Sequence, residues 1–101
     1  MDLEYLYNHI SEELEGSKEY IKIAIELKPM TEAWSKKFYT MSMEEHAHAA
    51  NFYAMFNEYC SKLSESFVEM PEYVADMRKD IVDKYIECTA KIKSMWEIYK
   101  S

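Results

Sequence analysis

The sequence predicts an all-α fold of three antiparallel helices, and three observations support this class. The chain has 101 residues, enough for one domain, and 49% of them are hydrophobic, which is too apolar for a disordered chain. It contains only one glycine and two prolines, too few turn formers for a sheet of short strands. Apolar residues recur at steps of three and four along three long segments, the period of an amphipathic helix. We therefore expect a single helical domain over residues 1–101.

The predicted helices cover residues 2–28, 31–64 and 70–99. Asp2 is the expected N-cap of the first helix and Thr31 that of the second, because a short side chain with an oxygen can bond the free backbone N–H groups there. Pro71 lies at the expected start of the third helix, where proline is tolerated. Ser66 and Glu69 have capping-box spacing, which leaves open a start a few residues earlier.

Charge and hydropathy restrict the classes of partner. The formal net charge is −7, from 19 acidic and 12 basic residues, so the electrostatic field repels nucleic acid and anionic membranes and favours cations or basic proteins. No apolar run approaches the roughly 20 residues of a membrane span. The N-terminal segment MDLEYLYNHI is acidic and has no signal-peptide core. We expect a soluble, cytoplasmic protein.

The two cysteines, Cys60 and Cys88, lie far apart and form no CxxC pair. This spacing indicates neither a zinc ribbon nor a redox-active dithiol. We expect two ordinary buried thiols in a reducing compartment.

Heptad spacing separates the residues expected in the core from those expected at the surface. In the first helix it selects Leu3, Leu6, Ile10, Glu13, Ser17, Tyr20, Ala24 and Leu27. In the second helix it selects Trp34, Phe38, Met41, Glu45, His48, Phe52, Met55 and Tyr59. In the third helix it selects Val74, Met77, Ile81, Tyr85, Cys88, Ile92, Met95 and Tyr99. Charged or imidazole side chains thus occupy core positions in the first two helices only.

Glu13, Glu45 and His48 are predicted to meet at one level of the core. If the first two helices form a hairpin that turns at Pro29, Glu13 lies as far before the turn as Glu45 lies after it. His48 follows Glu45 by three positions, so both lie on one helix face. A buried carboxylate is costly unless it is paired or bound to a metal, and this donor set suits iron, manganese or zinc. The alternatives are a Glu–His hydrogen bond without metal and core positions assigned to the wrong face.

Three other polar residues lie near these positions in the sequence. Glu44 and His46 fall outside the core spacing, and we expect both to be solvated. A metal entry route or a transient second site is the alternative role for them. His9, near the N-terminus, is also expected at the surface.

The segments ELEGSKEY in the first helix and EEHAH in the second resemble the ferritin-like di-iron carboxylate proteins. In that family a glutamate is followed seven positions later by tyrosine, here Glu13 and Tyr20. The next helix carries Glu-x-x-His, here Glu45 and His48. The resemblance implies that Glu45 bridges two metals and that Glu13 and His48 each bind one. It also implies that Tyr20 lies just outside the ligands or takes part in redox chemistry.

One chain supplies only half of such a centre. Full-length members contain two such helix pairs, with four glutamates and two histidines around two metals. The third helix here has no Glu-x-x-His, and its Glu87 lies off the apolar positions. A homodimer would supply the missing half by two-fold symmetry, as in the encapsulated ferritins, which this chain resembles. It shows neither their targeting tail nor the CxxC pairs of the rubredoxin-like module of rubrerythrins.

The sequence therefore predicts a ferritin-like metal-binding protein, at least dimeric, with a di-iron or di-manganese centre between subunits. If the protein is an enzyme, the resemblance implies oxidation of ferrous iron by dioxygen or peroxide. The alternative function is that of a non-catalytic acidic helical module, an adaptor or an inhibitor of a basic partner. A hydrolytic or proton-transfer site at Glu45 and His48 lacks a nucleophile and oxyanion donors.

Overall fold

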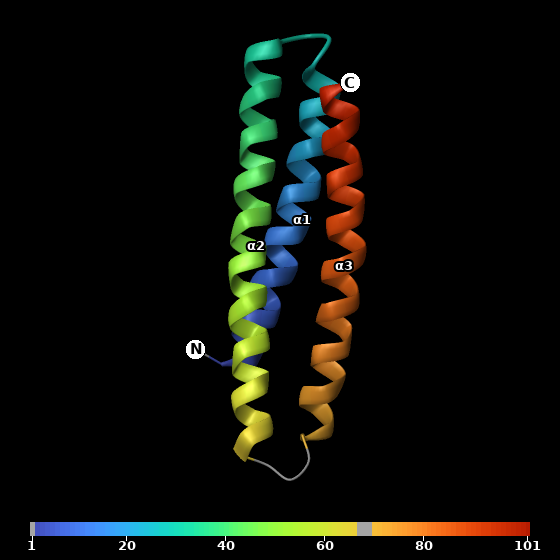
Figure 1. Cartoon of the computed structure of the whole chain (residues 1–101). Helices are drawn as coiled ribbons and strands as arrows, with labels where there is room; N and C mark the ends of the chain where they lie inside the picture. The colour runs from blue at the N-terminus through green and yellow to red at the C-terminus, as the bar shows by residue number, and fades with distance from the viewer. Residues whose placement is uncertain (1, 67–69) are drawn as a thin grey trace.

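A computed structural model describes residues 2–66 and 70–101 of the chain. It consists of three helices, α1 (Leu3–Leu27), α2 (Glu32–Ser66) and α3 (Glu72–Lys100). They lie side by side in an elongated antiparallel bundle (Figure 1) with principal extents of 57 × 22 × 15 Å. The described ranges contain no strand, and none of their helices is both long and apolar enough to cross a lipid bilayer. The predicted all-α class of three antiparallel helices is confirmed.

Local chemistry accounts for the helix ends. Asp2 Oδ1 accepts a hydrogen bond from the backbone N–H of Tyr5 at 2.9 Å, as expected of an N-cap. Thr31 Oγ1 accepts from the backbone N–H of Trp34 at 3.4 Å, which confirms the second predicted cap. The alternative capping box involves Glu69, which lies outside the described residues.

Small side chains fill the contact between α1 and α2. Ser17 and Ala24 of α1 and Ser35, Ser42 and Ala49 of α2 are all fully buried. Ser17 Oγ donates to the Ser42 carbonyl oxygen and Ser42 Oγ donates to the Ser17 carbonyl oxygen, each at 2.7 Å. Ser35 Oγ donates to the Ala24 carbonyl oxygen at 2.5 Å. Because each of these three serine hydroxyls has a partner on the facing helix, serine is compatible with this close contact.

The buried face of α2 is shifted by one residue from the prediction. Its buried residues are Ser35, Ser42, Ala49, Phe56 and Cys60. Four of the apolar residues predicted there are exposed, and we call them the outer stripe of α2: Trp34, Met41, Met55 and Tyr59. The other two, Phe38 and Phe52, are partly buried. The prediction followed the largest apolar side chains, whereas the helix contact uses the small side chains beside them. Large apolar groups therefore remain on the surface.

The prediction for α1 is wrong at two positions, because the strict heptad spacing selected a polar or aromatic residue directly before the apolar residue that is buried. Leu14 and Ile21 are fully buried, while the predicted core residues Glu13 and Tyr20 are only partly buried. The two polar groups therefore lie beside the α1–α2 contact rather than inside it.

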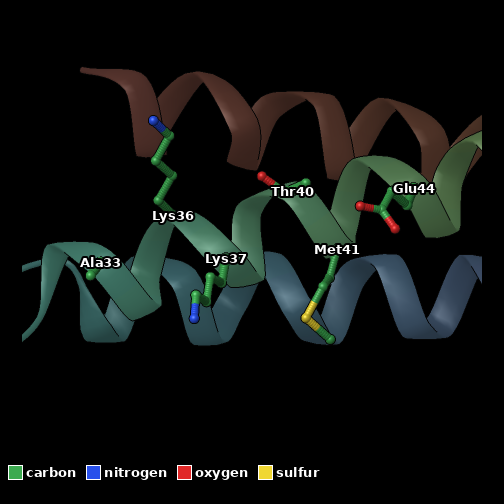
Figure 2. A pocket seen from close by; sticks show the side chains of 6 residues that line it. All are labelled: Ala33, Lys36, Lys37, Thr40, Met41 and Glu44. Atoms are coloured by element: carbon green, nitrogen blue, oxygen red, sulfur yellow. The ribbon is translucent and has the colours of Figure 1, made fainter.

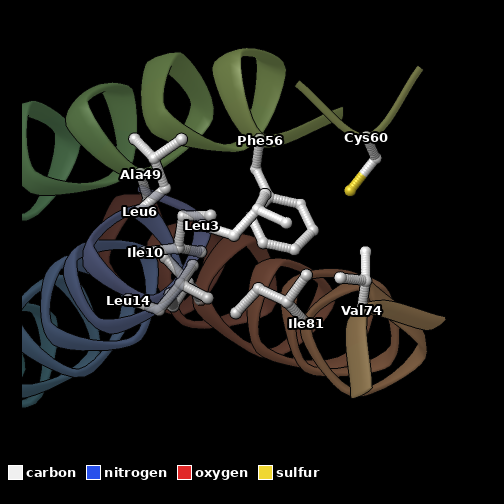
Figure 3. Close-up of a cluster of buried hydrophobic side chains, with 10 residues drawn as sticks. Leu3, Leu6, Ile10, Leu14, Ala49, Phe56, Cys60, Val74 and Ile81 are labelled. Carbon is white, nitrogen blue, oxygen red and sulfur yellow. The ribbon is translucent and has the colours of Figure 1, made fainter. Parts of the chain in front are cut away.

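The third helix packs mainly against α1. Its buried residues, Val74, Ile81 and Ile92, all belong to the predicted core positions. They join one hydrophobic cluster (Figure 3) with Leu3, Leu6, Ile10, Leu14, Ala49, Phe56 and Cys60. Trp96 Nε1 also donates to Ser42 Oγ at 2.9 Å, so α3 contacts the serine pair that joins the other two helices.

Cys60 and Cys88 are free thiols. Cys60 is buried in the hydrophobic cluster, where burial raises the pKa of its thiol. Cys88 is only partly buried, so the expectation of two buried thiols holds for Cys60 alone. A raised pKa keeps the Cys60 thiol protonated and poorly reactive at neutral pH.

Replacing Ser42 with alanine is expected to lower the free energy of unfolding by about 1–3 kcal/mol. The change removes the hydroxyl that bonds both the Ser17 carbonyl and the Trp96 indole N–H. Urea unfolding followed by circular dichroism measures the loss. Ser61→Ala is the matched control, because Ser61 is exposed and its hydroxyl bonds only the Asn57 carbonyl one turn earlier. Equal losses in the two variants would contradict the role given to Ser42.

Candidate metal centre

Glu13 of α1 comes together with Glu45 and His48 of α2. One ligand atom from each of the three residues lies within 4.8 Å of the other two. His48 Nδ1 is 3.5 Å from Glu13 Oε2. The hairpin therefore brings the two glutamates to one level, as their equal distances from the turn predict. That the three residues bind a metal remains a prediction.

The cluster lies at the edge of the α1–α2 contact and not in the centre of the core. The Glu13 side chain is 19% exposed and the His48 side chain 54% exposed, and Glu45 is partly buried. The alternative that core positions were assigned to the wrong face is thus correct for the four residues of the outer stripe of α2. The three polar residues nevertheless converge, because they flank the close contact on the same side.

The two carboxyl groups of the cluster disfavour each other's charge. The pKa of Glu45 is raised to about 7, chiefly by a hydrogen bond with Glu13, then by burial and by the Glu13 charge, while His48 acts in the opposite direction. A hydrogen bond between two carboxyl groups requires a proton on one of them. Glu13 Oε2 is buried and has no hydrogen-bond partner. A cation in this position would replace the shared proton and satisfy that oxygen, so the residues fit a metal ion.

Tyr20 does not join the three clustered residues. It lies two helical turns from Glu13, about 10 Å along the axis of α1. Its ring packs against Phe38, with the ring centroids 5.9 Å apart. The role that the resemblance implies for Tyr20 therefore stays a prediction.

Glu44 and His46 differ in their surroundings. Glu44 is exposed, as predicted. The prediction for His46 is wrong: it is partly buried, its Nε2 lies 2.9 Å from Thr89 Oγ1, and its ring meets Trp96 edge-on at 5.4 Å. Burial lowers the pKa of His46, and the charge of Lys93 adds to this effect. His46 serves the packing of α3 on α2, which the spacing within α2 alone does not reveal.

His9 is also less solvated than predicted. Its side chain is 34% exposed, and its ring centroid lies 4.2 Å from that of Tyr5 and 5.3 Å from that of Phe52. The imidazole is therefore a partly buried member of an aromatic group on α1 and α2.

A surface cavity of about 590 Å³ lies along α2 (Figure 2) and offers poor chemistry for a cation. It is lined by Ala33, Lys36, Lys37, Thr40, Met41 and Glu44. Its two ammonium groups outnumber its single carboxylate, so its electrostatic field opposes binding of a positive ion. The cluster of Glu13, Glu45 and His48 remains the better metal site.

Comparison with known protein families gives one match. The family model described as Rubrerythrin matches residues 4–100, a range that includes α3 as well as the two helices that carry the motifs. No significant match is found among curated proteins or solved structures.

In the metal-free protein at pH 8, Glu45→Gln is expected to raise the free energy of unfolding by about 1 kcal/mol after allowance for solvent screening. Glutamine removes a negative charge from beside Glu13. The sign follows from linkage. A carboxyl group with a raised folded-state pKa stabilises the fold below its usual pKa of 4.5, and this contribution is lost as the pH rises through about 7.

Urea unfolding of chelator-treated protein at about pH 5 and pH 8 measures this difference. Glu44→Gln is the matched control, since it removes a neighbouring but exposed carboxylate. The interpretation is wrong if Glu45→Gln gains no more stability at pH 8 than Glu44→Gln does.

Proposed function

Because this chain belongs to the rubrerythrin family of ferritin-like di-iron carboxylate proteins, we propose that it binds two iron ions at a centre shared by two copies of the chain. One observation carries the proposal. Glu13, Glu45 and His48 present ligand atoms within 4.8 Å of one another. The family match over residues 4–100 supports iron as the metal, and the same oxygen and nitrogen donors also suit manganese or zinc.

A second copy of the chain completes this centre. The cluster holds two glutamates and one histidine, half of the four glutamates and two histidines that enclose a di-iron site in a helix bundle. A two-fold axis beside Glu45 and His48 doubles the set. The outer stripe of α2 supports this arrangement, because Trp34 is 62% and Met55 42% exposed on the helix that carries the ligands. Large apolar groups left in water mark an interaction surface.

The chain's own residues have distinct parts in the proposed centre. Glu13, Glu45 and His48 would hold the two metals, each offering one ligand atom within 4.8 Å of the others. The carboxylates offset the positive charge of the ions, and His48 contributes a neutral nitrogen ligand. Tyr20 is the proposed redox-active neighbour on α1. When bound, paired iron ions supply the chemistry for oxidation of ferrous iron by dioxygen or peroxide.

Protein purified from iron-supplemented medium is expected to contain about one metal ion per chain, since two metals occupy each four-helix centre. It is also expected to have the mass of a dimer or a larger assembly. Elemental analysis and light scattering measure the two quantities. Glu45→Ala should lose the metal and Glu44→Gln should keep it. Metal-free monomers whose stability is unchanged by Glu45→Ala would contradict the proposal and leave the acidic interaction module.

Anaerobic protein loaded with ferrous iron is expected to oxidise it faster than buffer does when oxygen is admitted. The absorbance of ferric iron follows the reaction. His48→Ala should slow it toward the rate in buffer because a nitrogen ligand is lost, whereas His9→Gln, a histidine change outside the cluster, should not. A rate no faster than buffer would leave metal binding without ferrous oxidation.

A further inference from the structure

Gly16, the one glycine of the chain, lies inside α1 at the level of the metal cluster. A glycine in a helix interior costs about 1 kcal/mol relative to alanine. No glycine in the described ranges has a positive φ, so the backbone conformation at this position does not require one. The need for glycine must come from the space around it.

That space is filled by the side chain of Glu45. A Cβ atom at position 16 would lie 3.2 Å from Glu45 Oε2, 3.6 Å from its Cδ and 3.7 Å from its Cγ. The contact with Oε2 is tighter than most contacts that a Cβ atom makes, whereas the two carbon distances are ordinary van der Waals contacts. Glu45 lies across α1 where a side chain would otherwise stand.

The helices cannot easily move apart to admit a methyl group here. Ser17, the next residue after Gly16, exchanges hydrogen bonds of 2.7 Å with Ser42, one turn before Glu45. Trp96 donates to the same Ser42 hydroxyl from α3. Separating α1 from α2 would break buried hydrogen bonds, which is unfavourable. An added methyl group would therefore push the Glu45 carboxylate aside by a few tenths of an ångström.

We propose that Gly16 is a positioning residue of the metal centre, which leaves room for the Glu45 carboxylate to reach Glu13 and His48. This inference rests on the proposed metal binding but adds a requirement of its own. The centre requires close contact between the helices and also a position on α1 that has no side chain. Gly16 itself touches no metal in this arrangement.

The Gly16→Ala variant of the full chain tests the proposal, with cobalt(II) as the probe because its visible absorption depends on the ligand geometry. We expect its affinity for cobalt to fall about 10- to 100-fold, the range for residues that orient a metal ligand, and its absorption bands to shift. The helix content should be kept, since alanine favours a helix more than glycine does. Unchanged affinity and an unchanged spectrum would overturn the proposal.

Ala54→Gly is the matched control, because Ala54 is an exposed residue of α2. This variant replaces an alanine with a glycine, the opposite change to Gly16→Ala, at a position away from the metal cluster. We expect a lower urea midpoint and unchanged cobalt binding. A loss of cobalt affinity equal to that of Gly16→Ala would mean that the loss does not depend on the contact between position 16 and Glu45.

A double-mutant cycle in metal-free protein tests the contact without any metal. In the Glu45→Ala background nothing opposes the added methyl group, so Gly16→Ala should raise the urea midpoint more there than in the unmodified chain. Equal shifts of the urea midpoint in both backgrounds would mean that the added methyl group does not contact Glu45. If Gly16→Ala alone unfolds the chain and Gly16→Ala with Glu45→Ala restores it, the contact is supported.

Different results would contradict the proposed metal binding and the proposed role of Gly16. An unmodified chain that binds no cobalt or iron overturns the proposed function, and the positioning of a metal ligand falls with it. An unmodified chain that binds cobalt, together with a Gly16→Ala variant that binds it equally well, overturns only the role of Gly16.

Discussion

The reciprocal hydrogen bonds between Ser17 and Ser42 hold α1 and α2 together, and the arrangement of the cluster depends on this contact. The axes of packed helices lie about 8–10 Å apart, and the spacing grows with the size of the side chains at the contact. Serine and alanine allow a closer approach, and the facing carbonyl groups satisfy the hydroxyls. Glu13 lies one turn before Ser17, and Glu45 lies one turn after Ser42. Close contact of the serines therefore brings the two carboxyl groups together.

The same contact has two unfavourable consequences in a single chain, one for charge and one for apolar surface. The carboxyl groups of Glu13 and Glu45 lie so close that a proton shared between them raises the Glu45 pKa to about 7. Beside them, the outer stripe of α2 leaves Trp34 and Met55 in water. Departures from the usual rules of packing and charge concentrate at functional sites. A cation would relieve the repulsion between the two carboxyl groups, and a second copy of the chain would cover the exposed apolar side chains. For this reason the proposed function includes both a metal ion and a dimer.

Much of this arrangement could be predicted from the sequence, because it depends on local chemistry and helix geometry. The low content of glycine and proline, together with the apolar period, predicted three helices, and Asp2 and Thr31 were identifiable as caps from their side-chain oxygens. Glu13 and Glu45 could be placed at one level because the rise per residue of a helix is constant.

The phase of α2 could not be predicted, since ranking residues by apolarity places Trp34 inside and Ser35 outside. A serine whose hydroxyl bonds a carbonyl of the facing helix has no distinct signature in one sequence. His46 was misassigned for a related reason: Thr89 and Trp96, which cover it, belong to another helix.

In the proposed centre, metal binding and association of two chains form one equilibrium. Each chain has a formal net charge of −7, and a shared centre places both copies of Glu13 and Glu45 within one small volume. Without cations, this repulsion opposes whatever apolar contact the outer stripe of α2 provides. Metal ions bound only by the dimer stabilise it by mass action. The proposed dimer would in turn supply ligands that one chain lacks and would cover His48, which is half-exposed in a single chain. Separate chains would then be the stable state without metal, and the complete ligand set would exist only where metal and partner are both present.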